Sequence, residues 1–297
     1  MSTSRIVYPA KQFLRLSYRQ VQKLLGGYGL TRFRVVRCIE GLVRAAVRGE
    51  FAEVLGHRMY LGAKDDLNLS VDGIYGPFET RTVQRQVRAG DVVVDIGANV
   101  GYYTLQFARL VGRDGRVFAF EPDPENFDLL DRNVRLNGYQ NVTLERKAIS
   151  DRTGKARFYL AEHKGDGRVY NSHDGRGWIE IEQVQLDEYF ENHRGGVDFI
   201  KMDIQGAEPA ALRGMTRLLG RHQTVKLLVE FWPVGLKLFG TKPAAFLRSL
   251  VELGFVLHNV DERDQRISVT SIAELVARYP AETNDTFNHT NLLCVRD

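Results

Sequence analysis

Apolar residues change their spacing along the chain, and from residue 91 onward short apolar runs alternate with segments of helical spacing. The runs are rich in β-branched and aromatic residues, as buried strands are, and cover 92–96, 116–121, 142–148, 199–203 and 225–231. Segments with the apolar spacing of helices cover 102–110, 123–136 and 207–219. This alternation predicts a doubly wound α/β fold, with helices on both faces of the sheet.

Weaker patterns extend the series on its C-terminal side. Further strands are expected at 156–160, 178–184, 255–260 and 291–295. A polar loop at 162–177 separates the first two of these strands, and a helix is expected at 243–253. Asp123-Pro124 supplies an N-cap and a first-turn proline, and Gly138 and Gly220 are expected to end helices.

The first part of the chain follows a different pattern. Residues 10–50 have helical apolar spacing interrupted by GGYG at 26–29, and 53–75 predict short strands with a turn at 62–66. A helix at 79–88 leads into the alternating series. We therefore expect an N-terminal helical and short-strand extension at 1–74 and a cofactor-binding domain at 75–297.

Composition places the chain among ordinary globular proteins. It has 297 residues, of which 43% are hydrophobic and 26% charged, enough for a large core. The sequence contains no apolar run of about 18 residues, so no membrane-spanning helix is expected. Cys38 and Cys294 lie far apart and form no metal-ligand spacing, so a reduced cytoplasmic environment is the simplest interpretation.

Positive charge is concentrated at the N-terminus. Residues 1–50 contain ten Lys and Arg against two Glu, whereas the whole chain has a net charge of only +4. The remainder is therefore acidic, and a uniform nucleic-acid-binding surface is not expected. Within the arm, four basic residues recur on one helical face: Lys11, Arg15, Arg19 and Lys23.

Three interpretations of this basic N-terminal arm remain open. It could be a solvated helix packed on the body or on a second subunit, which would suit a homodimer. It could instead be an interfacial helix that brings the protein to anionic lipid as a peripheral membrane protein. RNA binding is the third interpretation, although no aromatic-basic RNA motif accompanies the charge.

The stretch VVVDIGANVGYYT at 92–104 joins a strand to a helix through a glycine-containing turn. A dinucleotide turn requires G-x-G-x-x-G, but its second and third glycine positions fall on Asn99 and Tyr102 when counted from Gly97. Side chains at these positions would obstruct a pyrophosphate, and no P-loop lysine pattern is present. These features disfavour a nicotinamide-dependent oxidoreductase.

The remaining features of the turn suit a different nucleoside. Asp95 closes the strand at its carboxyl edge, where a carboxylate suits a positively charged ligand group, and Gly97 and Gly101 allow a close approach to the backbone. Glu121 ends the next strand, at the usual place for an acid that accepts hydrogen bonds from ribose. An ammonium, a ribose and no pyrophosphate together describe S-adenosylmethionine (SAM).

Several motifs together resemble one family. VVVDIGANVGYYT, FAFEPDPENF, AISDRTG, VDFIKMDIQGAE, VEFW and TNLLCV occur in this order and look like the FkbM family of SAM-dependent O-methyltransferases. The resemblance extends from about Tyr75 to Val295. It implies a Rossmann-like seven-stranded sheet with an antiparallel last strand at 291–295. It also implies SAM as the methyl donor and a hydroxyl acceptor on a sugar, a lipid-linked glycan or glycolipid, or a secondary metabolite such as a polyketide.

The resemblance also implies roles for individual residues. The methionine part of SAM would be held by Asp95, Gly97, Asn99 and Gly101. Glu121 would bind the ribose hydroxyls, and Ala148, Ile149 and Ser150 would border the adenine. Asn126 and Glu79 are further candidates, each of which could equally be a helix-start polar residue.

The strand at 199–203 supplies the best catalytic candidates. Its alternation places Lys201 and Asp203 on one face, where a buried lysine requires a charged partner. We expect Asp203 to act as base or to orient the acceptor and also to contact the cofactor, supported by Lys201 and by Glu230 at the end of the neighbouring strand. A purely structural ion network is the alternative.

Other polar residues give weaker indications. The family commonly has Glu where this chain has Gln205, which weakens any mechanism that needs a charge there. Asp203, Glu208 and Glu230 could together hold a divalent cation, but no compact ligand motif is visible and no metal is expected. None of the seven histidines lies in a metal or triad motif, although one could still be the base.

The sequence therefore predicts a SAM-dependent O-methyltransferase that acts on a hydroxyl of a small molecule. Phe231 and Trp232, after the fifth strand, could line the acceptor site or belong to the core. A non-catalytic SAM-binding or scaffold protein is the alternative from a different class, and a nicotinamide-dependent oxidoreductase is the less favoured enzyme.

Overall fold

A computed structural model describes residues 51–62, 65, 67–160, 167–171, 175, 177–193, 195–283 and 288–296. The chain divides into two units, Met1–Tyr75 and Gly76–Asp297. The expected division into a 1–74 extension and a 75–297 domain stays a prediction. The helices expected within 10–50 lie outside the described residues. In the part of the chain that is described, no helix is long and apolar enough to cross a membrane.

The described part of the first unit contains a small hairpin and one helical turn. Strands β1 (Ala52–Val54) and β2 (His57–Met59) pair antiparallel, and Leu55 and Gly56 between them both have positive φ. The turn expected at 62–66 falls largely outside the described residues. The short helix α3 (Leu69–Asp72) begins where Asp65 accepts the backbone N–H groups of Leu69 and Ser70.

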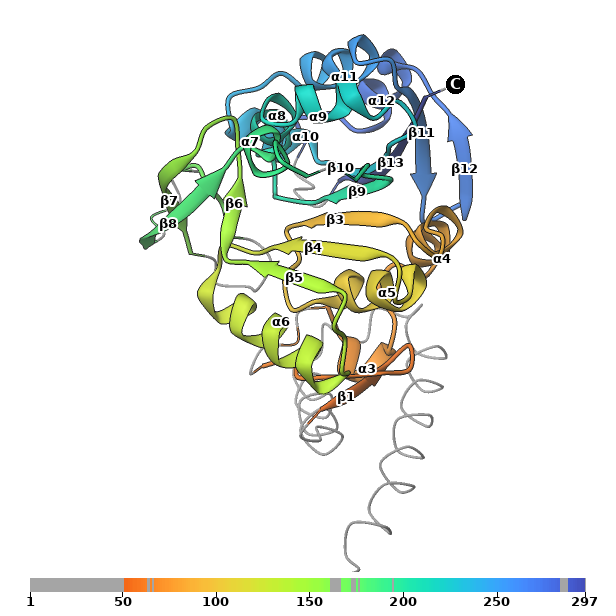
Figure 1. Cartoon of the computed structure of the whole chain (residues 1–297). Coiled ribbons are helices and arrows are strands. Elements are labelled where there is room, and N and C mark those ends of the chain that lie inside the picture. The colour runs from red at the N-terminus through yellow and green to blue at the C-terminus, as the bar shows by residue number, and fades with distance from the viewer. Residues whose placement is uncertain are drawn as a thin grey trace, which may run out of the picture. The chain divides into compact units, whose positions relative to one another are not determined.

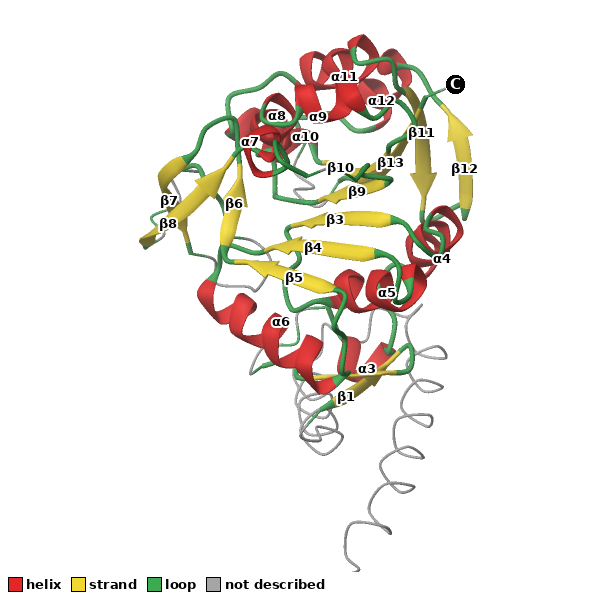
Figure 2. Ribbon diagram, in the orientation of Figure 1, coloured by secondary structure: helices red, strands yellow, loops and turns green. Residues whose placement is uncertain are grey.

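The second unit is built on one large sheet (Figures 1 and 2). In spatial order its strands are β12-β11-β13-β10-β9-β3-β4-β5. Their bounds are β3 (Val92–Ile96), β4 (Arg116–Phe120), β5 (Val142–Glu145), β9 (Phe199–Met202), β10 (Lys226–Phe231), β11 (Val256–Asp261), β12 (Arg266–Val269) and β13 (Thr290–Val295). Strand β13 runs antiparallel to both neighbours, β10 and β11, whereas β10, β9, β3, β4 and β5 pair parallel.

The sheet confirms the expected Rossmann-like architecture. The seven strands from β11 to β5 include the predicted antiparallel last strand, which is inserted between β10 and β11. An eighth strand, β12, pairs antiparallel with β11 at the edge and was not expected. Its pattern is weak because an edge strand of four residues buries little, and Val269 is 68% exposed.

Helices cover both faces of this sheet. On one side lie α4 (Pro77–Gln86), α5 (Tyr102–Val111) and α6 (Pro124–Leu136). The other side carries α7 (Leu186–Tyr189), α8 (Glu208–Arg213), α9 (Thr216–Arg221), α10 (Pro233–Leu238), α11 (Pro243–Glu252) and α12 (Ile272–Arg278). Asp123 caps α6 as predicted, because its carboxylate accepts the N–H groups of Glu125 and Asn126.

The two faces of the central strands differ in chemistry. The face toward α7–α12 is apolar and includes Val94, Ile96, Ile200, Met202, Leu227, Val229, Leu292 and Cys294. The alternate positions form a polar row on the opposite face, made by Asp95, Lys201, Glu230 and Asn291. Asp95 pairs with Lys201 and Glu230 pairs with Asn291, whereas Leu228 stands opposite Lys201, so the polar row shifts by two residues between β9 and β10.

Two of the expected elements are interrupted. The strand expected at 142–148 ends at Glu145, and β6 (Lys147–Ile149) joins a separate sheet of order β6-β8-β7 with β7 (Gly154–Tyr159) and β8 (Trp178–Val184). The helix expected at 207–219 breaks at Gly214, where a Cβ would lie 1.9 Å from the carbonyl oxygen of Ser150. Gly220 lies inside α9 and does not end it, so that expectation is wrong.

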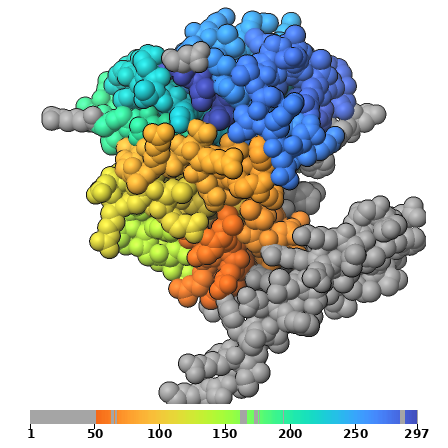
Figure 3. Space-filling model, turned by 90° about the vertical axis from the view of Figure 1, so that its right-hand side faces the viewer, coloured from red at the N-terminus to blue at the C-terminus, as the bar shows by residue number. Residues whose placement is uncertain are grey.

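Helix α4 is fixed to the C-terminal part of the same unit. The Glu262 carboxylate accepts the backbone N–H groups of Phe78 and Glu79, which satisfies free donors at the start of the helix. Figure 3 shows the orange surface of this region beside the blue surface of the C-terminal strands. The contact places the Glu79 side chain over the polar face of the sheet.

Candidate active site

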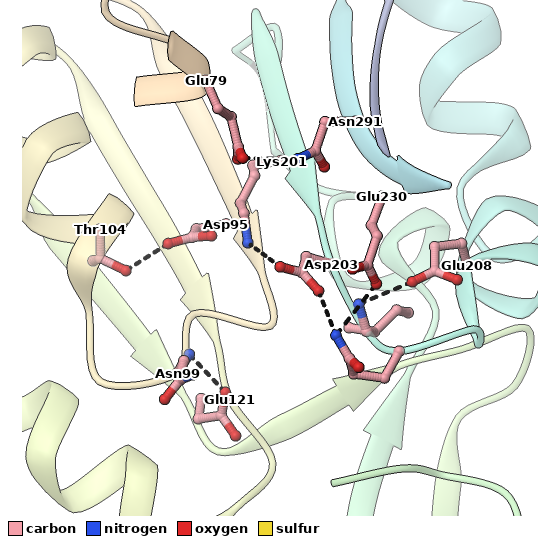
Figure 4. Close-up of polar contacts among 12 residues, drawn as sticks. Glu79, Asp95, Asn99, Thr104, Glu121, Lys201, Asp203, Glu208, Glu230 and Asn291 are labelled. Atoms are coloured by element: carbon pink, nitrogen blue, oxygen red, sulfur yellow. Dashed lines mark hydrogen bonds and ion pairs between the residues drawn. The ribbon is translucent and has the colours of Figure 1, made fainter. Parts of the chain in front are cut away.

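The site lies where β3, β4, β9 and β10 end, around the turn that follows β3 (Figure 4). In that turn the N–H groups of Gly97 and Ala98 both donate to the Phe120 carbonyl, which ties the turn to β4. Asn99 has a φ of 51°, and Gly101, with a φ of 93°, begins α5. Gly and Asn adopt the left-handed conformation more readily than other residues, which explains why they occupy these positions of the turn.

Gly97 is required by a close approach as well as by its backbone conformation. A Cβ at this position would lie 2.1 Å from the backbone oxygen of Asp203, and its φ is 77°. The turn after β3 therefore touches the loop after β9. Two of the predicted site residues, Gly97 and Asp203, are neighbours in space.

Glu121 connects the turn to the next strand. Its Oε2 accepts the N–H of Asn99 over 2.7 Å, and its Oε1 accepts the N–H of Asp123 over 2.9 Å. Burial raises the pKa of Glu121 to about 7, although the two hydrogen bonds favour the ionised form and lower the pKa. Each carboxylate oxygen keeps a second lone pair with which it could accept a hydroxyl.

Asp95 is fully buried in the polar row. Its Oδ2 accepts the hydroxyl of Thr104 over 2.6 Å, whereas its Oδ1 has no hydrogen-bond partner among the described residues. Burial raises its pKa, and the Lys201 ammonium opposes that rise. The amide oxygens of Asn99 and Asn126 are likewise buried without a hydrogen-bond partner in the described part of the chain.

These three acceptors suit the cofactor that the sequence predicts. SAM carries an ammonium, ribose hydroxyls and an adenine amino group, all of which can donate hydrogen bonds. Buried acceptors without partners cost free energy unless a ligand satisfies them. Together with the glycine positions, Asp95, Asn99 and Asn126 therefore fit a zwitterionic nucleoside.

Lys201 supplies the positive charge of the polar row. It faces Asp95 across paired strands, and its Nζ lies 3.3 Å from Asp203 Oδ2 and 5.2 Å from the centre of the Tyr103 ring. Burial alone would lower its pKa, but the carboxylates of Asp203, Asp95 and Glu79 raise it above the usual value. Lys201 therefore stays charged at neutral pH.

Glu79 approaches the same lysine from α4. Its Oε2 accepts the side-chain amide of Asn291 over 2.7 Å, and burial raises its pKa to about 7 while Lys201 opposes the rise. The buried Tyr103 hydroxyl lies beside it, and burial together with the Glu79 charge raises the pKa of this hydroxyl well above its usual value. Glu79 is thus part of the polar row.

Three further acids gather at the loop after β9. Asp203 Oδ1 and Glu230 Oε2 both accept from Gln205 Nε2, over 3.0 and 3.2 Å. Glu208 is fully buried and its Oε1 accepts the N–H groups of Ile204 and Gly206. The Asp203 side chain is 33% exposed, against 7% for Lys201, so Asp203 is the member of the ion pair that a second substrate could reach.

The pKa values of these acids move in different directions. Burial opposes ionisation of Asp203, but Lys201 and the Gln205 amide hold its pKa below the usual range. Burial and the charges of Asp203 and Glu208 raise the pKa of Glu230 well above its usual value. Burial raises the pKa of Glu208 to about 7. The site thus places Asp203, whose ionised form is favoured, beside Glu230, whose charged form is disfavoured.

Some predicted residues lie apart from this cluster. Ala148 is buried against Phe158 and Ile181, and Ile149 belongs to the main apolar core, so their place beside adenine stays a prediction. Phe231 is also a core residue. The Trp232 ring lies under the Arg168 guanidinium, 5.0 Å from its centre, and beside Gly235.

Sequence reasoning missed several members of the site. Thr104, Tyr103 and Asn291 lie within the quoted motifs but were given no role, although Asn291 could have been found from its alternation on the last strand. His289 precedes that strand and is exposed, and its charge contributes to the lowered pKa of Asp203. His163 and His173 lie outside the described residues. Within the described ranges, no group of three His, Cys, Asp or Glu residues is arranged to hold a metal ion.

Comparison with known proteins adds independent information. The family model described as the methyltransferase FkbM domain matches residues 95–257. This range begins at Asp95 and includes the glycine turn, Glu121, the loop after β9 and Glu230. The match therefore covers most of the polar cluster described above.

Two curated relatives and one solved structure illustrate the likeness. The chain is 31% identical over 143 residues to hexuronic acid methyltransferase AglP of Haloferax volcanii, covering 47% of this chain and 56% of that protein. It is 28% identical over 121 residues to a protein-L-isoaspartate O-methyltransferase of Caenorhabditis elegans, covering 36% and 54%. The chain thus spans about half the length of these relatives. A SAM-dependent methyltransferase structure from Aquifex aeolicus has a TM-score of 0.41 at 14% identity, covering 74% of this chain and 89% of that one.

Proposed function

Since the chain belongs to the FkbM family of SAM-dependent methyltransferases, we propose that it transfers the methyl group of SAM to a hydroxyl of a sugar. The observation that carries this proposal is the ionised Asp203, whose side chain is one-third exposed, beside the buried, charged Lys201. The family membership favours a methyltransferase over the two alternatives that the sequence left open, a non-catalytic scaffold protein and a nicotinamide-dependent oxidoreductase.

The cofactor site would be formed by the turn after β3 and the acid after β4. Asp95 Oδ1 would accept the ammonium of SAM, and Gly97 and Gly101 would let its methionine part lie against the backbone. Glu121 would accept the ribose hydroxyls with its free lone pairs. When bound, SAM supplies a methyl group that is already activated by a positive sulfur.

In the transfer step, Asp203 would serve as the general base. It would take the proton of the acceptor hydroxyl while the acceptor oxygen bonds to the methyl carbon, and the electron pair of the broken carbon–sulfur bond stays on sulfur. Lys201 would keep Asp203 ionised, whereas burial and the neighbouring carboxylates raise the pKa of Glu230 and disfavour its charge. The pair therefore keeps Asp203 in the ionised form that can accept a proton, although the lowered pKa makes this carboxylate a weak base.

The charge of the site favours a hydroxyl over a carboxylate as the reacting group. An acceptor carboxylate is already a nucleophile and needs no base, and it would face the negative Asp203 at short range. A neutral sugar hydroxyl needs a base and meets no such repulsion. Asp203 would then account for both the reaction and its selectivity.

A sugar is favoured as the acceptor by the relative with the longer of the two matches. That protein is a hexuronic acid methyltransferase, and its match covers 47% of this chain. We propose that this chain also accepts a sugar, either free or within a glycan or glycolipid. The carboxylate of a uronic acid would lie away from Asp203 while one of its hydroxyls reacts.

The test is transfer of a tritiated methyl group from SAM to a panel of glucose, glucuronic acid and their glycosides, followed by mild alkali. A methyl ether on a sugar hydroxyl survives alkali, whereas a methyl ester on a carboxylate is hydrolysed. Label that stays on the sugar supports the proposal. Label lost quantitatively to methanol would show a carboxylate acceptor and overturn it.

The basic N-terminal arm adds a proposal about location. Its ten basic residues within 1–50 support contact with an anionic lipid surface, which would suit a membrane-held glycolipid acceptor. Vesicles of phosphatidylcholine with phosphatidylglycerol should bind the protein, and replacing Lys11, Arg15, Arg19 and Lys23 by Gln should weaken binding. A matched control variant replaces the same number of basic residues outside the arm by Gln, namely the exposed Arg113, Arg135, Arg221 and Arg248. Equal loss in both variants would contradict a role specific to the arm.

A homodimer stays a prediction.

A further inference from the structure

Gln205 stands between two acids of the site. Its backbone has a φ of 58°, a left-handed conformation that is uncommon for a residue other than Gly. Its Nε2 donates to Asp203 Oδ1 over 3.0 Å and to Glu230 Oε2 over 3.2 Å. One amide group thus uses both of its hydrogens to join a carboxylate on the β9 side to a carboxyl group on β10.

The surrounding loop holds this residue in place. The Tyr170 hydroxyl donates to the Gln205 carbonyl over 2.6 Å, and Glu208 Oε1 accepts the N–H groups on either side, of Ile204 and Gly206. Gly206 packs so closely on Gly235 that a Cβ would lie 2.4 Å from its carbonyl carbon. The strained backbone is therefore fixed from three sides, as is typical of functional positions.

We infer that Gln205 is a positioning residue, whose side-chain amide orients the Asp203 carboxylate toward the acceptor and holds it beside Glu230. This inference rests on the proposed function, because it assigns Gln205 a task in the same site. Gln205 acts through Asp203 and does not itself touch the reacting atoms.

The hydrogen bonds of Asp203 support this assignment. Its Oδ1 accepts from Gln205 and its Oδ2 accepts from Lys201, so two donors on different sides define the plane of the carboxylate. Lys201 alone would leave the group free to rotate about its Cβ–Cγ bond. With the amide in place, the remaining lone pairs point in fixed directions, which is what a proton acceptor requires.

The choice of an amide follows from the charges around it. The groups whose charges act on the Asp203–Glu230 pair come from several elements: Lys201 on β9, Glu208 on α8 and His289 before β13. Glu79 and Asp95 add further acid through their interaction with Lys201. In so acidic a cluster, an amide can donate two hydrogen bonds without adding negative charge. A glutamate at 205 would add a charge and remove both donors.

The experiment is a carboxyl titration that needs no acceptor. The full chain is labelled with [4-¹³C]aspartate and [5-¹³C]glutamate, and the Asp203 and Glu230 signals are assigned with Asp203→Asn and Glu230→Gln. Titration midpoints are then compared in wild type, Gln205→Glu and Gln205→Met. Gln223→Glu, which adds the same charge at an exposed position, is the control.

We expect both midpoints to rise by about one pH unit in Gln205→Glu and by about half a unit in Gln205→Met, because a donor to each carboxylate is lost. Gln223→Glu should leave both unchanged. If the midpoints stay within about 0.2 units in both Gln205 variants, the inference is overturned. Should Gln205→Glu not fold, Gln205→Met, which adds no charge, decides the question.

A second measurement separates this inference from the proposed function. With the sugar that accepts the label, Gln205→Met should lower kcat about tenfold and move the acidic limb of its pH profile upward, while affinity for S-adenosylhomocysteine stays the same. A loss of kcat without movement of that limb would indicate a merely structural role and count against the inference. Full turnover by Asp203→Asn would instead overturn the proposed function.

Discussion

The backbone N–H of Asn99 donates to Glu121 Oε2 over 2.7 Å, which joins the turn after β3 to the acid after β4. Both residues also contribute to the proposed cofactor site, because Asn99 has an unpartnered buried amide oxygen within the described residues. A change in either residue should therefore alter the turn and the ribose position together.

Replacement of Glu121 by Gln should weaken cofactor binding. In the wild type both carboxylate oxygens of Glu121 accept backbone N–H groups. Glutamine has only one acceptor oxygen, so its amino group would face one of these N–H groups, and two donors cannot form a hydrogen bond. We expect a loss of 10- to 100-fold in affinity for S-adenosylhomocysteine, measured by calorimetry. Glu125→Gln changes an exposed acid nearby and should leave affinity intact. A change below twofold in folded Glu121→Gln would contradict the ribose assignment.

The close approach at Gly97 gives a prediction for stability. Gly97→Ala would place a Cβ 2.1 Å from the backbone oxygen of Asp203, at a φ of 77°. Gly90 has a φ of 89° but nothing within 4 Å of its Cβ position, so Gly90→Ala tests the backbone strain alone. In urea unfolding we expect a loss of about 1 kcal/mol for Gly90→Ala and more than about 3 kcal/mol for Gly97→Ala. Equal losses would show that the close approach is unimportant.

Removal of the buried lysine should destabilise the protein in a pH-dependent way. In Lys201→Met, Asp203 and Asp95 lose the positive charge that favours their ionised forms. We expect a loss of about 3–5 kcal/mol in the free energy of unfolding at pH 8 and a smaller loss at pH 5.5, where these acids can be protonated. Urea unfolding at both pH values measures it. The same loss at both would mean that Lys201 does not balance these carboxylates.

Several acids should make the protein without cofactor less stable as the pH rises. The pKa of Glu79, Glu121 and Glu208 is raised to about 7 in the folded protein, above the usual 4.5. Between these values the folded state holds protons that the unfolded state has lost. Stability from these groups is therefore complete below pH 4.5 and is lost as the pH rises through 7, by about 1.4 kcal/mol per unit for each group.

Thermal unfolding between pH 5 and pH 7.5 tests this sign. The Tm should fall over this range without cofactor. It should fall less with saturating SAM, because the positive sulfonium and the ribose donors favour ionised carboxylates. A Tm that rises from pH 5 to pH 7.5 would contradict the raised pKa values.

The sequence predicted what depends on local pattern. The apolar run at 92–96, the Asp123 cap and the alternation of Lys201 with Asp203 are all readable from neighbouring residues, and each appears in the structure. The last strand was placed at 291–295, and the structure gives Thr290–Val295. Helix α12 was missed although Ser271 and Glu274 form a capping box, a signal that the sequence does carry.

Features that depend on distant contacts could not be read in this way. The helix breaks at Gly214 because the chain there passes close to the carbonyl of Ser150, and no sequence pattern near Gly214 predicts that contact. Gln205 looked like a weakness in the catalytic motif, because only the structure shows that its amide bridges Asp203 and Glu230. The Glu79–Asn291 pair joins residues at opposite ends of the domain sequence, so it too required the fold.

The central claim is that Asp203 is the base of SAM-dependent methyl transfer to a sugar hydroxyl. The most direct measurement is the single-turnover rate of labelled methyl transfer from SAM to the accepting sugar, by wild type and by Asp203→Asn. We predict a loss of at least about 100-fold in Asp203→Asn, while calorimetry shows affinity for S-adenosylhomocysteine within threefold of wild type. Transfer at the wild-type rate by a folded, cofactor-binding Asp203→Asn would contradict the account.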